Sequence, residues 1–446
     1  MSAPSSPPTT SPIHSSRRVS WRHQLARRAL FERLAHLEHG ELTFHEGGHT
    51  WTFGRRTRDL DVSAHVFVER PELYSRLALG GTVGAAEAFM AGWWRTPHLV
   101  ELVRILVRNR RVLVGLDGGL ARVTSPLLKF GHWLRANTRR GSRRNIAAHY
   151  DLGNDLYALF LDDTWMYSCG FFEDDTNDLR AASIAKNERI CVKLALGPQH
   201  HVLDIGGGWG GFALHAATRF GCKVTMTTIS QQQHELACER VRRAGLEQRI
   251  TVLNADYRDL RGTFDRVVSI EMIEAVGHSF HDAYFRCIGD RLTADGMALV
   301  QAITVSDQHY DEVRTGVDFI KRYIFPGSCL PSVRRMLDCA GRVSDLRLFH
   351  LEDLTPHYAL TLAHWRRRFV AAHEAVRALG HGEDFARMWE FYLAYCEGGF
   401  AERFTGLAQL VFTKPSCPRS PIAPPTRELA GLRQPGAPPA VVREHA

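Results

Sequence analysis

The sequence predicts an α/β fold in which a Rossmann-like parallel sheet carries helices on both faces, with a helical cover and a small α+β domain before it. Three observations lead to this fold class. From about residue 183 onward, strand patterns alternate with helix patterns. The strand 201–205 runs directly into five glycines within six positions, Gly206 to Gly211. Before residue 110, short alternating strands are instead followed by helices.

The small domain is expected over residues 21–110. Apolar and polar residues alternate in Leu42–Phe44 and again in Trp51–Phe53, with Gly-rich residues between them, which predicts a hairpin. Residues 62–68 alternate in the same way and predict a third strand. A helix is expected after Pro71, because proline is well suited to the first turn of a helix.

Composition divides the rest of the chain. Ser- and Pro-rich segments are expected to be disordered, because they hold too few apolar residues to form a core. The expected segments are a disordered tail at 1–20, a basic linker at 111–145, a large sheet domain at 146–414 and a Pro-rich disordered tail at 415–446.

The large domain is expected to hold a parallel sheet, because strands and helices alternate along it. The expected strands are 201–205, 223–229, 250–254, 265–270, 297–303, 343–349 and 407–413, with helices at 183–196, 210–219 and 231–244 and a helical cover at 361–400. A ligand of such a sheet binds over the carboxyl ends of the strands.

The glycine-rich turn predicts a nucleotide-type ligand, since glycine lets a ligand approach the backbone N–H groups at a helix N-terminus. The glycines also satisfy the G-x-G-x-x-G spacing of dinucleotide sites, which is weak evidence by itself. A dinucleotide site further needs an acidic residue after the second strand, where this chain has Ser230 and Gln233. An acidic residue, Asp256, follows the third strand instead. These residues favour S-adenosylmethionine over a nicotinamide dinucleotide.

Composition excludes several other classes of protein. The nine cysteines form no C-x-x-C pair, which argues against a disulfide framework and a structural zinc site. No apolar stretch approaches the ~20 residues that cross a bilayer. The net charge is +8, and residues 104–144 hold eleven Arg or Lys against one acidic residue, Asp117. This basic stretch predicts attraction to lipid headgroups or to nucleic-acid phosphates, or it is simply a solvated helix face.

Four separated motifs make the chain resemble the cyclopropane-fatty-acyl-phospholipid synthase family. The resemblance runs from about Arg144 to Lys414, and Ala86–Trp94 is similar, more weakly, to the family's lipid-associated N-terminal domain. The motifs are His149–Asp155 with Tyr167–Gly170, Asp204–Gly211, Glu271–Gly277, and Phe319–Gly327 with Leu330–Ser332.

The resemblance implies a class I methyltransferase that moves the methyl group of S-adenosylmethionine to the cis double bond of a phospholipid acyl chain. A carbocation would form, and loss of a proton would close a cyclopropane ring. Such a cation needs a site without water, and aromatic faces can stabilise it. The aromatic residues expected in this role are Tyr167, Phe319, Tyr323 and Phe325.

In the family, a bound bicarbonate accepts the proton. By motif position its ligands are Cys169, Glu274 and Tyr358, and Gln301 stands where the family has His. A glutamine amide can donate a hydrogen bond to the anion but cannot carry a proton. Bicarbonate is therefore an open expectation, and a product with a methylene or methyl branch becomes the alternative.

The resemblance also implies the residues that bind the methyl donor, and it implies no metal. The expected donor site comprises Asp204 with Gly206, Gly208 and Gly210 at the methionine part, Ser230 and Gln233 at the ribose, Asp256 and Tyr257 near the adenine, and Tyr167 and Ser168 on the sulfonium side.

We expect a cytoplasmic enzyme that associates peripherally with the inner face of the membrane, takes unsaturated phospholipid chains, and forms a homodimer as the family resemblance suggests. A nucleic-acid methyltransferase is a distant alternative, because Glu271-Met-Ile-Glu274 stands where an Asn- or Asp-Pro-Pro-Tyr type of motif is expected. A non-catalytic lipid-binding paralogue is the other, motivated by the lost His.

Overall fold

The computed structural model describes residues 20–111, 141, 152–173, 178–420 and 422. The chain divides into two compact units that are interleaved in sequence. The first comprises the described residues of Met1–Gly131 with Val317–Tyr323 and His373–Glu402, and the second comprises those of His132–Gly316, Ile324–Ala372 and Arg403–Ala446. No helix among the described residues combines the length and apolarity that crossing a membrane requires.

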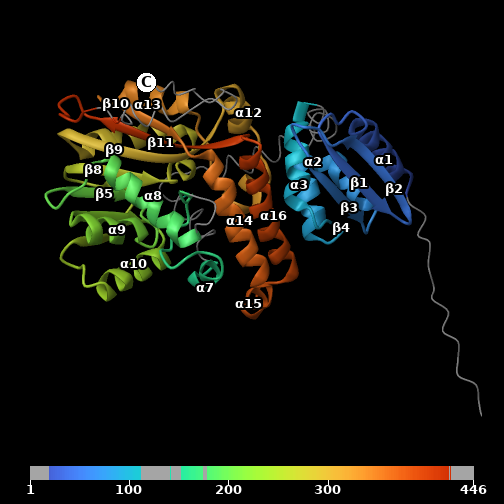
Figure 1. Ribbon diagram of the computed structural model, residues 1–446, viewed down its shortest axis with the longest axis horizontal. Coiled ribbons are helices and arrows are strands. Elements are labelled where there is room, and N and C mark those ends of the chain that lie inside the picture. The colour runs from blue at the N-terminus through green and yellow to red at the C-terminus, as the bar shows by residue number, and fades with distance from the viewer. Residues whose placement is uncertain (1–19, 112–140, 142–151, 174–177, 421, 423–446) are drawn as a thin grey trace, which may run out of the picture. The chain divides into compact units, whose positions relative to one another are not determined.

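The first unit is built on a four-stranded sheet of order β2-β1-β3-β4 (Figure 1). The predicted hairpin and third strand are present, since β1 pairs antiparallel with β2 and parallel with β3. The elements of this unit are α1 (Trp21–Leu34), β1 (Gly40–Glu46), β2 (His49–Arg55), β3 (Ser63–Val68), α2 (Glu72–Met90), β4 (Trp94–Arg95), α3 (Leu99–Arg108), α15 (His373–Ala378) and α16 (Glu383–Ala401).

Helix α16, distant in sequence, completes this unit by packing on α2 and α3. Gly398 makes the close approach of α16 to α3 possible, because a Cβ atom there would lie 2.6 Å from the Cγ1 atom of Val103. Phe319 also joins this core, with its ring centroid 4.9 Å from that of Phe391 on α16. Part of the expected helical cover therefore belongs to the N-terminal unit.

The second unit holds a seven-stranded sheet of order β10-β11-β9-β8-β5-β6-β7 (Figure 1). Strands β5 to β9 are parallel to one another, whereas β11 runs antiparallel to both of its neighbours, β9 and β10. The strands are β5 (His201–Ile205), β6 (Lys223–Thr228), β7 (Ile250–Asn254), β8 (Phe264–Ile270), β9 (Leu292–Val305), β10 (Arg347–Asp353) and β11 (Thr405–Thr413).

Helices cover both faces of this sheet, which confirms the predicted fold class. Neighbouring residues of a strand point to opposite faces. Accordingly, Val202 packs in the core of α8, α9 and α10, and Leu203 packs in the core of α11 and α13. The α-helices are α7 (Asn154–Ala158), α8 (Leu179–Lys193), α9 (Gly211–Phe220), α10 (Gln231–Arg243), α11 (His281–Arg291), α12 (Tyr310–Thr315), α13 (Val333–Val343) and α14 (Thr355–Ala371).

Short helical turns complete the second unit, and one strand differs from its expected position. The turns are η1 (Tyr257–Asp259), η2 (Ile273–Ala275), η3 (His278–Phe280) and η4 (Asp307–His309). The π-helix η5 (Ile320–Ile324) belongs to the first unit except for Ile324. Strand β10 begins at Arg347 rather than at residue 343, because helix α13, capped by the Ser332 hydroxyl, continues to Val343.

Candidate active site

The glycine-rich turn joins β5 to α9 as the sequence predicts. Gly206, Gly208 and Gly210 have φ angles of 80°, 58° and 83°, which residues with a side chain rarely adopt. A Cβ atom at Gly206 would also lie 2.6 Å from the Cγ atom of Met272. The turn therefore needs glycine for its backbone conformation, and it leads directly into α9, whose N-terminus favours an anionic or polar ligand.

Asp204, on β5, places a buried carboxyl group directly before this turn. The residue is 1% exposed, and its Oδ2 atom has no hydrogen-bond partner among the described residues. Burial raises the pKa of this carboxyl to about 7, against the opposing charge of Lys186. A buried carboxylate oxygen at the end of β5 fits the ammonium group of the methionine part of S-adenosylmethionine.

The other residues predicted for the donor lie at the carboxyl ends of β6 and β7. The Ser230 hydroxyl caps α10 by accepting from the Gln233 backbone N–H group at 3.4 Å, and the Gln233 side chain accepts from Thr228 at 2.7 Å. Asp256 pairs with Arg258, with 2.6 Å between Oδ2 and Nη2. These contacts hold the residues in place, and their roles toward ribose and adenine stay predictions.

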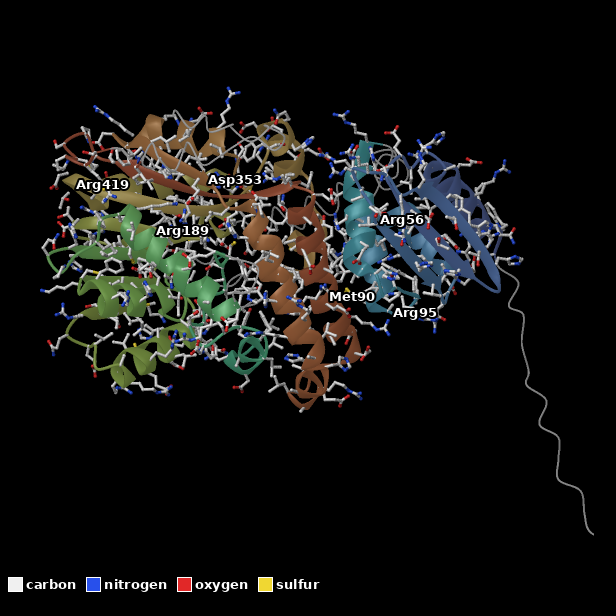
Figure 2. All side chains as sticks on the ribbon, viewed as in Figure 1. Arg56, Met90, Arg95, Arg189, Asp353 and Arg419 are labelled. Atoms are coloured by element: carbon white, nitrogen blue, oxygen red, sulfur yellow. The ribbon has the colours of Figure 1, made fainter. Side chains whose placement is uncertain are left out.

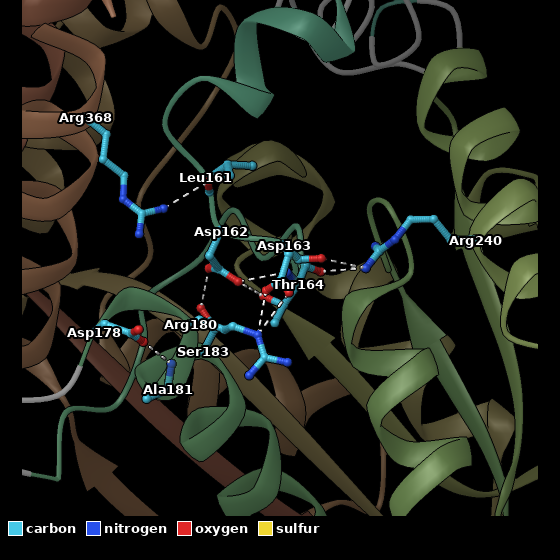
Figure 3. Close-up of polar contacts among 10 residues, drawn as sticks. All are labelled: Leu161, Asp162, Asp163, Thr164, Asp178, Arg180, Ala181, Ser183, Arg240 and Arg368. Carbon is cyan, nitrogen blue, oxygen red and sulfur yellow. Dashed lines mark hydrogen bonds and ion pairs between the residues drawn. The ribbon is translucent and has the colours of Figure 1, made fainter. Parts of the chain in front are cut away.

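A polar network fastens the segment that leads into Tyr167, Ser168 and Cys169 (Figure 3). Asp162 accepts from the Ser183 hydroxyl of α8 at 2.8 Å. Arg240 of α10 donates to the Thr164 carbonyl at 3.1 Å, and Arg368 of α14 donates to the Leu161 carbonyl at 3.1 Å. Three helices thereby hold this segment, which positions the residues that follow it.

Aromatic rings extend from the glycine-rich turn to the Tyr358 hydroxyl. The ring centroids are 5.0 Å apart from Trp209 to Tyr157, 5.3 Å from Tyr157 to Tyr167, 5.1 Å from Tyr167 to Trp365 and 6.2 Å from Trp365 to Tyr358. We call these five residues the aromatic wall. Their faces are apolar and electron-rich, so the wall can exclude water and stabilise a cation.

Glu271, rather than Glu274, is the carboxylate that three of the predicted site residues contact. Its Oε1 atom accepts from the Cys169 backbone N–H group at 2.9 Å and from the Gln301 amide at 2.8 Å. Its Oε2 atom accepts from the Tyr358 hydroxyl at 2.5 Å. Burial raises the pKa of Glu271, and these donors oppose that shift.

Sequence reasoning did not identify Glu271 as a site residue. The available signal was its place directly after the predicted strand 265–270, which puts it at the carboxyl end of the sheet. A second signal appears only in the structure. Glu271 has a φ angle of 50°, one of four non-glycine residues with positive φ among those the structure describes. Such a conformation costs free energy and is often retained at functional sites.

Glu274 lies close enough for the Glu271 charge to act on it. Its Oε1 atom accepts from the Ile303 backbone N–H group at 2.5 Å. Its Oε2 atom is buried and has no partner among the described residues. Burial, followed by the charge of Glu271, raises the pKa of Glu274 to about 8. The three donors around Glu271 favour its ionised form, whereas burial and the Glu271 charge favour the protonated form of Glu274.

The thiol of Cys169 takes no part in the contact with Glu271. It donates to the Gly170 carbonyl at 3.1 Å, and burial together with the Glu271 charge raises its pKa well above the usual range. The buried Lys186 ammonium donates to the Ser168 hydroxyl at 3.2 Å. Burial lowers the pKa of Lys186 to about 8, and the charge of Glu271 opposes this shift.

The predicted bicarbonate does not fit this arrangement. The backbone of Cys169 and the side chains of Gln301 and Tyr358 already donate to the Glu271 carboxylate. A second anion at the same donors would meet a like charge within hydrogen-bond distance, which is strongly unfavourable in a buried site.

Other predicted features fall in the first unit or outside the described residues. Phe319 and Tyr323 belong to the first unit, where the Tyr323 hydroxyl donates to Glu87 at 2.5 Å, and their roles at the site stay predictions. Of the basic segment 104–144, residues 112–140 and 142–144 lie outside the described residues, as do the first three residues of His149–Asp155 and most of both tails. Arg104 and Arg108 of that segment both pair with Glu402 of the first unit.

Comparison with known proteins gives this site a family. Residues 137–410 match the family described as mycolic acid cyclopropane synthetase. The chain is 38% identical over 352 residues to tuberculostearic acid methyltransferase UfaA1 of Mycobacterium tuberculosis, covering 77% of this chain and 82% of that protein. It is 36% identical over 354 residues to cyclopropane-fatty-acyl-phospholipid synthase of Escherichia coli, covering 79% and 88%.

A solved structure agrees with these relatives. The mycolic acid cyclopropane synthase CmaA1, complexed with SAH and CTAB, superimposes with a TM-score of 0.57 at 32% identity, covering 61% of this chain and 98% of that one. The chain therefore belongs to the mycolic acid cyclopropane synthetase family and is an S-adenosylmethionine-dependent methyltransferase.

Proposed function

We propose that the chain methylates the cis double bond of an unsaturated phospholipid acyl chain and that the product is a cyclopropane ring. The observation that carries this proposal is the aromatic wall, which links the glycine-rich turn of the donor site to a carboxylate at the carboxyl end of β8. An alkene is a weak nucleophile, so the site must position it and keep water out.

Each part of the site has a task in this reaction. S-adenosylmethionine, when bound, supplies an electrophilic methyl group. The N–H groups of the glycine-rich turn and the free oxygen of Asp204 bind its methionine part. Tyr167 and Trp365, whose ring centroids lie 5.1 Å apart in the aromatic wall, stabilise the positive charge that develops on the second alkene carbon. A nearby base then takes a proton from the new methyl group.

A branched product is the second candidate, and Gln301 is the observation that favours it. In that reaction a hydride first shifts from the methylated carbon to the cationic carbon, and loss of a methyl proton then forms a methylene group. The names of two relatives agree with either product, because one is a cyclopropane-fatty-acyl-phospholipid synthase and the other a tuberculostearic acid methyltransferase.

The same proposal includes docking to the membrane surface, because the basic segment 104–144 carries charges that attract anionic lipid headgroups.

Purified protein, S-adenosylmethionine and vesicles of a cis-monounsaturated phospholipid test the function. We expect the acyl chain to gain the mass of one CH₂ group. Ring protons in the NMR spectrum of the product identify a cyclopropane, and an exocyclic alkene signal identifies the methylene branch, since the two have equal mass. Methylation of nucleic acid with no change in lipid would reject the proposal, and so would donor binding without any turnover, as expected of a non-catalytic paralogue.

A further inference from the structure

The donors around Glu271 point to a base that belongs to the chain itself. We propose that the Glu271 carboxylate, not a bound bicarbonate, accepts the proton that the alkyl cation loses. This inference rests on the proposed function and names the proton acceptor at the same site.

The hydrogen bonds to Glu271 leave one position free for a proton. A carboxylate has about four lone-pair positions on its two oxygens. The Cys169 N–H group and the Gln301 amide use Oε1, and the Tyr358 hydroxyl uses Oε2. One lone pair of Oε2 remains, and Oε2 is also the atom that contacts the aromatic wall, through the Tyr358 hydroxyl.

A chain of amides fixes the direction of these hydrogen bonds. Lys193 can only donate, and its ammonium group contacts the Gln409 oxygen Oε1 and Glu352. The Gln409 nitrogen Nε2 therefore faces the Gln301 oxygen Oε1 at 2.8 Å. The Gln301 nitrogen Nε2 in turn faces Glu271. Lys193 thus makes Gln301 a donor, and its partner Glu271 must be an acceptor.

The surroundings of this amide chain are well fixed. Gln301 on β9 pairs in register with Gln409 on β11, and both side chains are 0% exposed. Glu352 of β10 also pairs with Arg189. Arg189, which is labelled on α8 in Figure 2, places its guanidinium 4.0 Å from the Phe171 ring centroid. Lys193, Gln409 and Gln301 are therefore positioning residues that act through Glu271.

The backbone of Glu271 is an independent observation. Its φ angle of 50° suits glycine better than glutamate, yet its N–H group is tied to the Gln301 carbonyl at 2.8 Å. A glycine here would relieve the conformation and would vacate the position between the three donors. The chain keeps a glutamate here despite the free-energy cost of its backbone conformation, as expected if the carboxylate is required.

The step balances without a further reactant. Glu271 Oε2 bonds to a proton of the new methyl group, and the methyl C–H bond breaks. The electron pair of that bond forms the third bond of the cyclopropane ring or, after the hydride shift, the second bond of the exocyclic alkene. The proton on Glu271 then passes to water once the product has left.

Binding of ¹³C-labelled bicarbonate, followed by NMR, tests this assignment without any turnover. We expect no bound bicarbonate in the wild type. In Glu271→Gly we expect bicarbonate to bind, because the vacated donors then need an anion. Ala195→Gly is the matched control, since Ala195 is exposed and also has a positive φ angle of 47°. Bound bicarbonate in the wild type would overturn the proposal.

Turnover on the phospholipid vesicles gives a second test. The wild type should keep its full rate in bicarbonate-free buffer, whereas Glu271→Gln should lose about a hundredfold or more, with SAH affinity retained. Added bicarbonate or formate should raise the turnover of Glu271→Gly at least tenfold. A wild-type rate that collapses without bicarbonate, or a Glu271→Gln rate equal to the wild type, would refute the assignment. If the wild type modified no lipid at all, the proposed function would be rejected. The bicarbonate-binding measurement would still show whether Glu271 occupies the place of the anion.

Discussion

Each compact unit holds a glutamate that accepts a tyrosine hydroxyl at 2.5 Å, and the other partners of the two glutamates differ. In the first unit, Glu87 receives Tyr323 and also forms ion pairs with Arg76 and Arg322. In the second, Glu271 receives Tyr358 together with a neutral amide and a backbone N–H group.

The difference shows which carboxylate can act as a base. Two guanidinium groups neutralise Glu87, so that protonating it would leave two cations without their partner. Neutral donors hold Glu271 in place but leave its negative charge, and burial raises its pKa. A hydrogen bond from a tyrosine to a glutamate is therefore not enough to identify a catalytic site. The charge of the glutamate's other partners determines whether it can accept a proton.

The largest expected effect concerns Glu274, which has neither the arginines of Glu87 nor the donors of Glu271. Its pKa rises from 4.5 unfolded to about 8 folded. The folded protein therefore binds the proton more tightly, and wild-type stability falls as the pH rises from about 4.5 to about 8. Glu274→Gln should lack this loss and gain about 3 kcal/mol relative to the wild type between pH 5 and 8.

Urea unfolding at the two pH values measures this gain. Glu247→Gln, at an exposed glutamate, is the control and should shift stability equally at both pH values. Equal shifts for Glu274→Gln as well would show that burial and the Glu271 charge do not raise the pKa of Glu274.

Tyr358→Phe is the next in size. It removes the hydroxyl donor from Glu271 while keeping the ring in the aromatic wall, and we expect turnover to fall about thirtyfold, or ~2 kcal/mol. Steady-state rates on phospholipid vesicles provide the measurement. Tyr310→Phe, which removes a hydroxyl bonded to the neutral His278 at 2.6 Å, is the control. Comparable losses in both variants would remove the special role of Tyr358.

Lys193→Met should lower turnover about tenfold, a transition-state effect of ~1.4 kcal/mol. Without the ammonium group, the Gln409 amide can flip so that its oxygen and nitrogen exchange places. The Gln301 amide can then flip as well and present its oxygen to Glu271. A carboxylate that faces an oxygen is harder to ionise, so the acid limb of the pH–rate profile should move to higher pH. Lys223→Met, at an exposed lysine, should leave the limb in place. An unmoved limb in Lys193→Met would contradict the amide chain.

Glu87→Gln should have the smallest effect, a loss of about 1 kcal/mol in the free energy of unfolding. The estimate is low because the Arg76 and Arg322 side chains are 47% and 36% exposed, and water screens such pairs. Thermal unfolding measures the loss, with Glu32→Gln as a control, since that glutamate pairs with Arg28 at 64% and 80% exposure. A hundredfold loss of turnover at unchanged stability would break the comparison and support the predicted catalytic role of Tyr323.

Much of the candidate site could be predicted because it depends on local sequence. The five glycines after an apolar strand identify the donor turn, since only glycine tolerates that backbone. The alternation of strands and helices also predicts the sheet and its two covered faces. The start of β10 was predicted too early, because the end of helix α13 and the start of the strand compete for the same residues.

The sequence by itself determined the fold class, the donor turn and the set of residue types at the site. Only the tertiary structure decided which carboxylate the donors contact, because Glu271 and Glu274 are three residues apart and share one motif. The choice depends on contacts from β9, β11 and α14, which lie 30 to 138 residues further along the chain. Hydrogen-bond direction and burial are properties of those distant contacts, and no local pattern encodes them.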